Sequence, residues 1–249
     1  MSDLAAAASP RPFSIVYGHA GLGKTQFLTQ MPGTLALDMR REIRSAPEGT
    51  TPFTPTNLTH LERLRAASAK PEGERSFARL GIDGINELYQ LVLDLAADGK
   101  IDWNGERANR NVQSWHKIAG PWLEQWLRDV NMGVPVMANA HRKIERESFR
   151  DYDVVRVVMN LPTGIRERLE KRADIILYVQ MMPGGTKSQW VSRPAVTVRE
   201  REIPSKGWEK VYRREEYHLT SPKDRYDALP ERSELSASAF LSALDHVGA

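Results

Sequence analysis

The stretch SIVYGHAGLGKTQF, residues 14–27, passes from an apolar run through three glycines to a lysine and a threonine. The segment from Gly18 to Thr25 has the spacing G-x-x-x-x-G-K-[ST] of a phosphate-binding loop, or P-loop. Glycines allow backbone conformations that other residues avoid, so that the N–H groups can converge on phosphate oxygens. The helix-forming residues that follow would point a positive helix end at the same anion. The stretch therefore predicts a strand, a nucleotide-binding loop and a helix, in that order.

Every residue of this loop is expected to contact ATP. The loop comprises Gly18, His19, Ala20, Gly21, Leu22, Gly23, Lys24, Thr25 and Gln26. Lys24 would reach the β- and γ-phosphates, and the hydroxyl of Thr25 would be a ligand of Mg²⁺. The alternative interpretation is a glycine-rich turn that joins a strand to a helix without a ligand.

Two further segments carry polar residues expected at the nucleotide. Asp83 ends the apolar run FARLGID and fits the carboxylate that holds the water shell of Mg²⁺, although it could also cap a helix starting near Ile85. VMANAH places Asn139 and His141 at the carboxyl end of a strand, where open α/β sheets bind ligands. We expect His141 to sense the γ-phosphate; a structural histidine is the alternative.

Composition restricts the class of protein. The 249 residues are 41% hydrophobic, with a formal charge of +3 and a pI near 9.1, which permits a nucleic-acid partner without requiring one. Cysteine is absent, so disulfides and thiolate chemistry are excluded. No apolar run approaches the roughly 18 residues of a membrane span, and the N-terminal segment lacks the features of a signal peptide. We expect a soluble protein of the cytoplasm, in a bacterium or a phage-infected host, with no membrane partner.

Strand-like and helix-like segments alternate along most of the chain. Strands are expected at residues 13–17, 34–38, 76–83, 134–140 and 173–180. Helices are expected at residues 25–30, 58–69, 85–97, 115–130 and 163–172, and Pro121 would kink or split the fourth. This alternation predicts an α/β fold in which helices cover both faces of a mostly parallel sheet.

The pattern changes after Met182. Apolar and charged residues alternate over about 187–222, which predicts an antiparallel hairpin or ribbon at the sheet edge. We expect residues 1–11 to be a disordered tail, residues 12–230 to form one core that includes this hairpin, and residues 231–249 to form a tail with a short helix over 237–245.

The chain resembles RecA-like P-loop ATPases, in particular the short RecA-core ATP-binding proteins of phages and prophages that are labelled AAA-family and grouped with single-strand annealing and recombination. The resemblance spans roughly residues 12–230. It rests on the order of the segments GHAGLGKT, LALD, LGID, VMANAH, RADIILYV and TSPKDRYDAL. It implies a RecA-like core that uses ATP and Mg²⁺ and assembles as a homo-oligomer, either a ring or a filament.

The PKDRY segment resembles the K-x-R element that RecA-like relatives place at a subunit boundary. The resemblance implies that Lys223 and Arg225 act in trans on the γ-phosphate bound by a neighbouring subunit. A cation inserted there would stabilise charge on the transferred phosphoryl group. A solvated turn is the alternative.

One departure concerns the residue that polarises the attacking water. RecA-like cores usually carry a glutamate two residues after the aspartate that ends the second strand. In LALDMRREIR, Arg40 occupies that place and Glu42 lies two residues further on. Either a local shift brings Glu42 into the site or hydrolysis is slow.

RecA-like cores hold single strands with two loops, which correspond here to residues 99–117 and 141–156. Cations interleaved with aromatic residues suit a phosphate backbone with stacked bases. The resemblance thus implies nucleic-acid contacts from Lys100, Trp103, Arg107, Arg110, Arg142, Lys143, Arg146 and Arg150. Both segments also contain acidic residues, so ordinary solvated loops are the alternative.

Three hypotheses follow. The first is an ATP-binding and ATP-hydrolysing RecA-like protein that binds single-stranded DNA in recombination or strand annealing. The second is another P-loop NTPase, such as a helicase loader of the AAA+ type or a small-molecule kinase. The third is a nucleotide-binding scaffold with weak hydrolysis, which Arg40 at the glutamate position favours.

Overall fold

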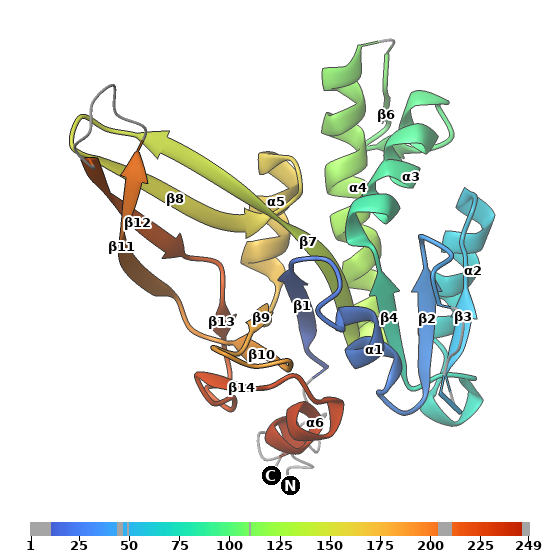
Figure 1. The fold of residues 1–249 in the computed structure, drawn as a ribbon. Helices are drawn as coiled ribbons and strands as arrows, with labels where there is room; N and C mark the ends of the chain where they lie inside the picture. The colour runs from blue at the N-terminus through green and yellow to red at the C-terminus, as the bar shows by residue number, and fades with distance from the viewer. Residues whose placement is uncertain (1–10, 44–46, 49, 110, 204–210, 246–249) are drawn as a thin grey trace, which may run out of the picture.

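The computed structural model describes residues 11–43, 47–48, 50–109, 111–203 and 211–245 (Figure 1). The tail expected at residues 1–11 therefore lies outside the described part, apart from Arg11. No helix in the described ranges is long and apolar enough to cross a membrane.

A parallel sheet forms the centre of the molecule (Figure 1). Its strands run in the order β3-β2-β4-β7-β1-β9. The bounds are β1 Phe13–Gly18, β2 Thr34–Asp38, β3 Thr51–Phe53, β4 Arg79–Asp83, β7 Val136–Ser148 and β9 Ile175–Met181. Three short strands continue the β9 side in antiparallel fashion: β10 Ser188–Val191 pairs with β9 and with β14 Arg232–Glu234, and β13 Lys223–Asp224 pairs with β9. The predicted mostly parallel α/β fold is confirmed.

Side chains that alternate along the strands form two apolar layers. In β1, Ile15 and Tyr17 face one layer, whereas Val16 faces the other. The first layer includes α2 Leu58–Ser68, α3 Ile85–Ala97, α4 Val112–Gly133 and α5 Thr163–Arg172. The second includes α1 Lys24–Thr29 and α6 Ala237–Asp245. Helices thus cover both faces, as the unbroken apolar strands predict.

Helix α4 is continuous, with Pro121 inside it, rather than split at the proline. Asn111 caps its start by accepting a hydrogen bond from the Gln113 N–H, and Trp126 donates from Nε1 to the Leu61 carbonyl at 2.9 Å. The second bond ties α4 to α2. A 3₁₀ turn, Glu72–Glu74, follows α2, and a two-stranded hairpin of β5 Asp102–Trp103 and β6 Glu106–Arg107 connects α3 to α4.

A four-stranded ribbon projects from the body and corrects the expected second loop (Figure 1). Beyond His141, β7 continues as an antiparallel partner of β8 Tyr152–Met159, so most of the segment 141–156 is strand rather than loop. The hairpin of β11 Ala195–Ile203 and β12 Val211–Leu219 was expected within 187–222, and β12 adds to β8 in parallel. We call the four strands β7 (from Arg142), β8, β12 and β11 the ribbon.

Candidate functional site

The loop between β1 and α1 has the conformation its glycines allow. Gly21 and Gly23 have φ angles of 76° and 80°, in the left-handed region that favours glycine. Gly18 is required for another reason, because a Cβ there would lie 2.5 Å from the carbonyl oxygen of Val179 on the neighbouring strand β9. The Phe27 N–H bonds to the Gly23 carbonyl at 2.8 Å and begins the helix directly after the loop.

Lys24 is folded back across this loop. Its ammonium donates to the carbonyls of Gly18 at 3.3 Å and His19 at 2.6 Å, and the residue is only 7% exposed. Burial, together with the positive charge of Arg40, lowers the pKa of Lys24 to about 8, although Asp83 opposes the shift. The site therefore lacks negative charge around Lys24, which a polyphosphate would supply.

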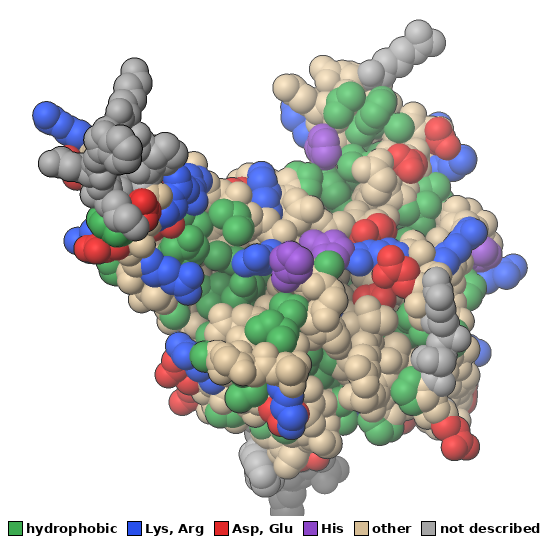
Figure 2. Space-filling model, viewed as in Figure 1, with side chains coloured by type: hydrophobic (Ala, Val, Ile, Leu, Met, Phe, Trp, Pro, Cys, Tyr) green, Lys and Arg blue, Asp and Glu red, His purple; other side chains and the backbone are tan. Residues whose placement is uncertain are grey.

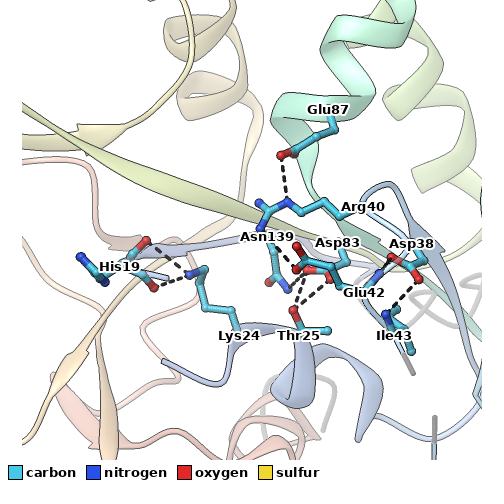
Figure 3. Close-up of polar contacts among 11 residues, drawn as sticks. His19, Lys24, Thr25, Asp38, Arg40, Glu42, Ile43, Asp83, Glu87 and Asn139 are labelled. Carbon is cyan, nitrogen blue, oxygen red and sulfur yellow. Dashed lines mark hydrogen bonds and ion pairs between the residues drawn. The ribbon is translucent and has the colours of Figure 1, made fainter. Parts of the chain in front are cut away.

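Thr25 at the start of α1 forms a hydrogen-bonded group with the buried Asp83 and Asn139 at the carboxyl ends of β4 and β7 (Figure 3). The Thr25 hydroxyl donates to the Asp83 carboxylate at 2.9 and 3.0 Å, and the Asn139 Nδ2 donates to the same carboxylate at 3.0 Å. Helix α3 is capped by Gly84 without a side-chain bond, so the alternative of Asp83 as a helix cap is not observed. The buried Oδ1 of Asn139 has no hydrogen-bond partner among the described residues and is free to accept a hydrogen bond from a ligand or a water.

The donor set fits Mg²⁺. A hydroxyl and a carboxylate 2.9 Å apart are the hard oxygen groups this ion prefers, with phosphate and water oxygens completing its shell. No cluster of three His, Asp or Glu residues that could hold a metal occurs in the described ranges. Thr25 and Asp83 would therefore hold Mg²⁺ only together with a bound nucleotide.

The turn after β2 presents Arg40 to this group and Glu42 to its rim. The Asp38 carboxylate accepts the N–H groups of Glu42 at 2.9 Å and Ile43 at 3.0 Å, which fixes the turn. The Arg40 Nε donates to Glu87 at 2.8 Å, and Arg40 lies 3.9 Å from the Glu42 carboxylate. The Glu42 side chain is 61% exposed. Glu42 thus borders the site without a fixed position in it.

His141 lies on β7 beside Gly18, the first residue of the loop, and lines the cleft. Burial and the charges of Arg40 and Lys24 lower the pKa of His141 below its usual value, against the smaller effects of Glu87 and Glu42. These effects favour the neutral imidazole, which can donate one hydrogen bond without adding charge.

These groups surround one cleft of about 970 Å³, a volume within the range of cofactor sites. Its walls include Ala20–Gln26 of the loop, together with Arg40, Glu42, Asp83, Asn139 and His141. In the space-filling view, basic, acidic and histidine side chains meet at the middle of this face (Figure 2). The nucleotide-site residues predicted from three separate segments are thus brought together. Arg40 is an addition, since it was noted only as a departure from the pattern.

Lys223 and Arg225 lie away from this cleft. Lys223 pairs with Ile176 at the start of β9, whereas the loop leaves the sheet at the other end of β1, opposite Val179. Lys223 donates to the Glu170 carbonyl, and Arg225 forms an ion pair with Asp174 at 2.7 Å. They do not reach the nucleotide cleft of their own chain, so their role in trans stays a prediction.

The nucleic-acid candidates fall into two separate places. Lys100 pairs with Asp98, Trp103 packs against the core, and Arg107 is exposed on β6. Arg110 lies outside the described residues. The others lie in and beside the β7–β8 hairpin: Arg142 donates to the Tyr178 hydroxyl, Lys143 pairs with Glu145, Arg146 pairs with Asp153 and Glu215, and Arg150 lies in the turn.

Comparisons with known proteins agree with this site. No curated protein matches the chain. Among solved structures, the flagellar accessory protein FlaH from Methanocaldococcus jannaschii is similar over 74% of this chain and 78% of its own, with a TM-score of 0.36 and 8% identity. Neither value supports a transfer of function. A family described as an AAA domain matches residues 13–226, a range that contains the loop, Asp83, His141 and the ribbon. The chain therefore belongs to this AAA domain family of P-loop, nucleotide-binding ATPases.

Proposed function

We propose that the chain binds ATP with Mg²⁺ in this cleft and hydrolyses it slowly. The observation that carries the proposal is the contact of Thr25 with Asp83 at 2.9 Å beside the loop that holds Lys24. Lys24 binds the β- and γ-phosphates, Thr25 and Asp83 hold the metal, and the loop amides surround the phosphates.

Hydrolysis also needs a group that orients the attacking water. Asn139 Oδ1 is a buried acceptor on the cleft wall, and His141 donates to the terminal phosphate. Glu42 is the available general base, but its exposed side chain must move inward first. This movement, together with Arg40 at the place where relatives carry glutamate, is the reason for slow turnover.

Equilibrium dialysis with ATP and Mg²⁺ tests the proposed binding, and a phosphate-release assay tests the proposed hydrolysis. The wild type should retain ATP and release phosphate, and Lys24→Ala should do neither. Lys70→Ala, which removes an exposed lysine outside the cleft, should behave as the wild type. Retention of ATP with no phosphate release above background, in the wild type and in Glu42→Gln alike, would favour a scaffold. No retention by the wild type would refute the nucleotide site itself.

We further propose that the ATP-bound protein binds single-stranded DNA, as in recombination or strand annealing. The observation that favours this is the distribution of charge on the ribbon. The strand registers place four arginines and two buried carboxylates on one face: Arg146, Arg199, Arg201 and Arg213 with Asp153 and Glu215. The ion pairs of Arg146 and Arg201 with Glu215, and of Arg213 with Asp153, agree with this common face. We call it the basic face.

The basic face also carries an aromatic ring. The Arg199 guanidinium lies 4.8 Å from the centre of the Tyr217 ring, an arrangement on which a base could stack. The opposite face differs, because Glu200 and Glu216 lie there with Arg214. A phosphate backbone would thus meet net positive charge on one side of the ribbon only.

Fluorescence anisotropy with a labelled oligonucleotide tests this assignment. Arg199→Gln should weaken binding and reduce the slope of log affinity against log salt by about 1. Arg214→Gln, which removes the same charge from the opposite face, should change neither. Equal losses in the two variants would exclude the basic face as the interface. Equal affinity with and without ATP would exclude the coupling to nucleotide.

A further inference from the structure

Arg40 is a second cation of the nucleotide cleft, and it is partly buried. It comes from the turn after β2, on the wall opposite the phosphate loop, and its side chain is 18% exposed. Figure 3 shows its guanidinium between Glu87 on α3 and the group formed by Asp83 and Asn139. Only Glu87 and the distant carboxylate of Glu42 form ion pairs with it among the described residues.

The backbone that presents Arg40 has a strained conformation and is held in place by hydrogen bonds. The next residue, Arg41, has a φ of 59°, in the left-handed region that non-glycine residues seldom adopt. Such a conformation persists only where the surroundings enforce it. Here the buried Asp38 carboxylate holds the N–H groups of Glu42 and Ile43, so the turn keeps Arg40 directed into the cleft.

The electrostatics of the cleft favour additional negative charge beside Arg40. Arg40, Lys24 and His141 all line the same cleft, so two full cations and an imidazole share one region of it. Glu87 binds Arg40 through one carboxylate oxygen only, at 2.8 Å, and its second oxygen has no hydrogen-bond partner in the described ranges, so the guanidinium keeps donors for another anion. A phosphoryl group between Lys24 and Arg40 would relieve the repulsion between the two cations.

We infer that Arg40 is a specificity-determining residue that binds the terminal phosphate of a nucleoside triphosphate and thereby selects triphosphate over diphosphate. The inference rests on the proposed nucleotide site. The loop amides cradle the α- and β-phosphates, whereas Arg40 faces them from the opposite wall, where the third phosphate extends. The guanidinium exchanges Glu87 for phosphate oxygens, to which it can form two parallel hydrogen bonds.

Titration calorimetry with Mg²⁺ and either ADP or the slowly hydrolysed analogue ATPγS tests the inference. Arg40→Gln should weaken ATPγS binding by about tenfold to a hundredfold, since a charge-assisted bond is lost, and should change ADP binding by less than about threefold. Arg40→Lys keeps the charge and should restore part of the preference. Arg63→Gln removes an exposed arginine on α2 that is not part of the cleft, and should leave both affinities as in the wild type.

Glu87→Gln provides a second, independent measurement. It keeps an acceptor for Arg40 but removes the competing charge, so the preference for ATPγS over ADP should increase. A decrease would overturn the exchange with Glu87. Equal effects of Arg40→Gln on the two nucleotides, or no effect, would overturn the role of Arg40 while leaving the nucleotide site intact. Failure of the wild type to bind either nucleotide would instead refute the proposed function.

Discussion

Lys24 illustrates how single residues of the cleft are set for an anionic ligand. Its ammonium has two carbonyl partners, no carboxylate partner among the described residues, and a neighbouring cation in Arg40. Asp83, by contrast, receives two side-chain hydrogen bonds and stays a buried acceptor. Positive charge is thus left uncompensated where phosphates would lie, and negative charge is held where a metal would lie.

The pKa of Lys24, about 8, predicts how ATP affinity depends on pH. The free protein loses the Lys24 proton as the pH rises through 8, whereas bound phosphate favours the protonated form. The dissociation constant for MgATP should therefore be flat below pH 7.5 and rise by up to about tenfold per pH unit above pH 8. Calorimetry between pH 6.5 and 9.5 measures this rise, and an affinity that is constant over that range would contradict it.

The same shift predicts the stability of the ligand-free protein. The folded pKa of Lys24 is below the unfolded value of 10.5, so the unfolded chain binds more protons between pH 8 and 10.5. The contribution of Lys24 to the free energy of unfolding therefore rises with pH across that window. The cost of burying the charged form is largest below pH 8.

Among the elements, α4 and its neighbour α2 depend on a close approach at one glycine. A Cβ on Gly133 would lie 1.9 Å from the carbonyl oxygen of Ser68, a backbone atom that cannot move independently. Gly133→Ala should lower the free energy of unfolding by about 1–3 kcal/mol, because α2 and the end of α4 must separate.

A matched control lies in the same helix. An added Cβ on Gly120 would meet nothing within 4 Å apart from its own chain neighbours and helix backbone, so Gly120→Ala should leave stability unchanged or raise it by up to about 1 kcal/mol through helix propensity. Urea unfolding of the two variants measures whether the close approach of Gly133 to Ser68 limits stability. Similar free energies of unfolding for both would show that the contact with Ser68 is not limiting.

The sequence was sufficient for elements whose pattern is local. The strand 34–38 and the helix 85–97 are apolar segments bounded by turn residues, and each lies where it was predicted. The strand predicted at 76–83 ends at Asp83 as expected but begins at Arg79. The ribbon was only partly predictable, because β8 pairs with β12, some 60 residues later in the chain, and no local pattern records such a pairing. The β7 continuation was mistaken for a loop because its alternating charges also suit a solvated segment.

For the site as well, the sequence predicted the residues that local patterns place and missed those that depend on the folded backbone. The phosphate loop, Asp83 and His141 were found because strand ends and a fixed motif place them. The side chain of Arg40 points into the cleft because Arg41 has a left-handed conformation and because Asp38 accepts the N–H group of Glu42. Neither feature can be read from the sequence. The common face of Arg146 and Arg199 likewise depends on the registers of three strand pairs.

At the scale of the whole molecule, the cleft and the K-x-R segment lie at different ends of the sheet. Lys223 and Arg225 lie at the amino end of β9, whereas the cleft lies beyond the carboxyl end of β1. A contact between the two therefore requires a neighbouring copy of the chain placed head to tail, which is the arrangement that generates rings or filaments. Arg225 would have to exchange its partner Asp174 for phosphate at that boundary.

Mixing two inactive variants tests this arrangement. Lys24→Ala removes the nucleotide side of an interface, and Arg225→Ala removes the opposite side. If Arg225 acts in trans, each variant alone is inactive, but a 1:1 mixture that has exchanged subunits contains both intact sides at about a quarter of its interfaces. Phosphate release by the mixture should then recover to about a quarter of the wild-type rate. If the mixture remains as inactive as its components after complete subunit exchange, Arg225 does not act on a neighbour, and its ion pair with Asp174 is structural.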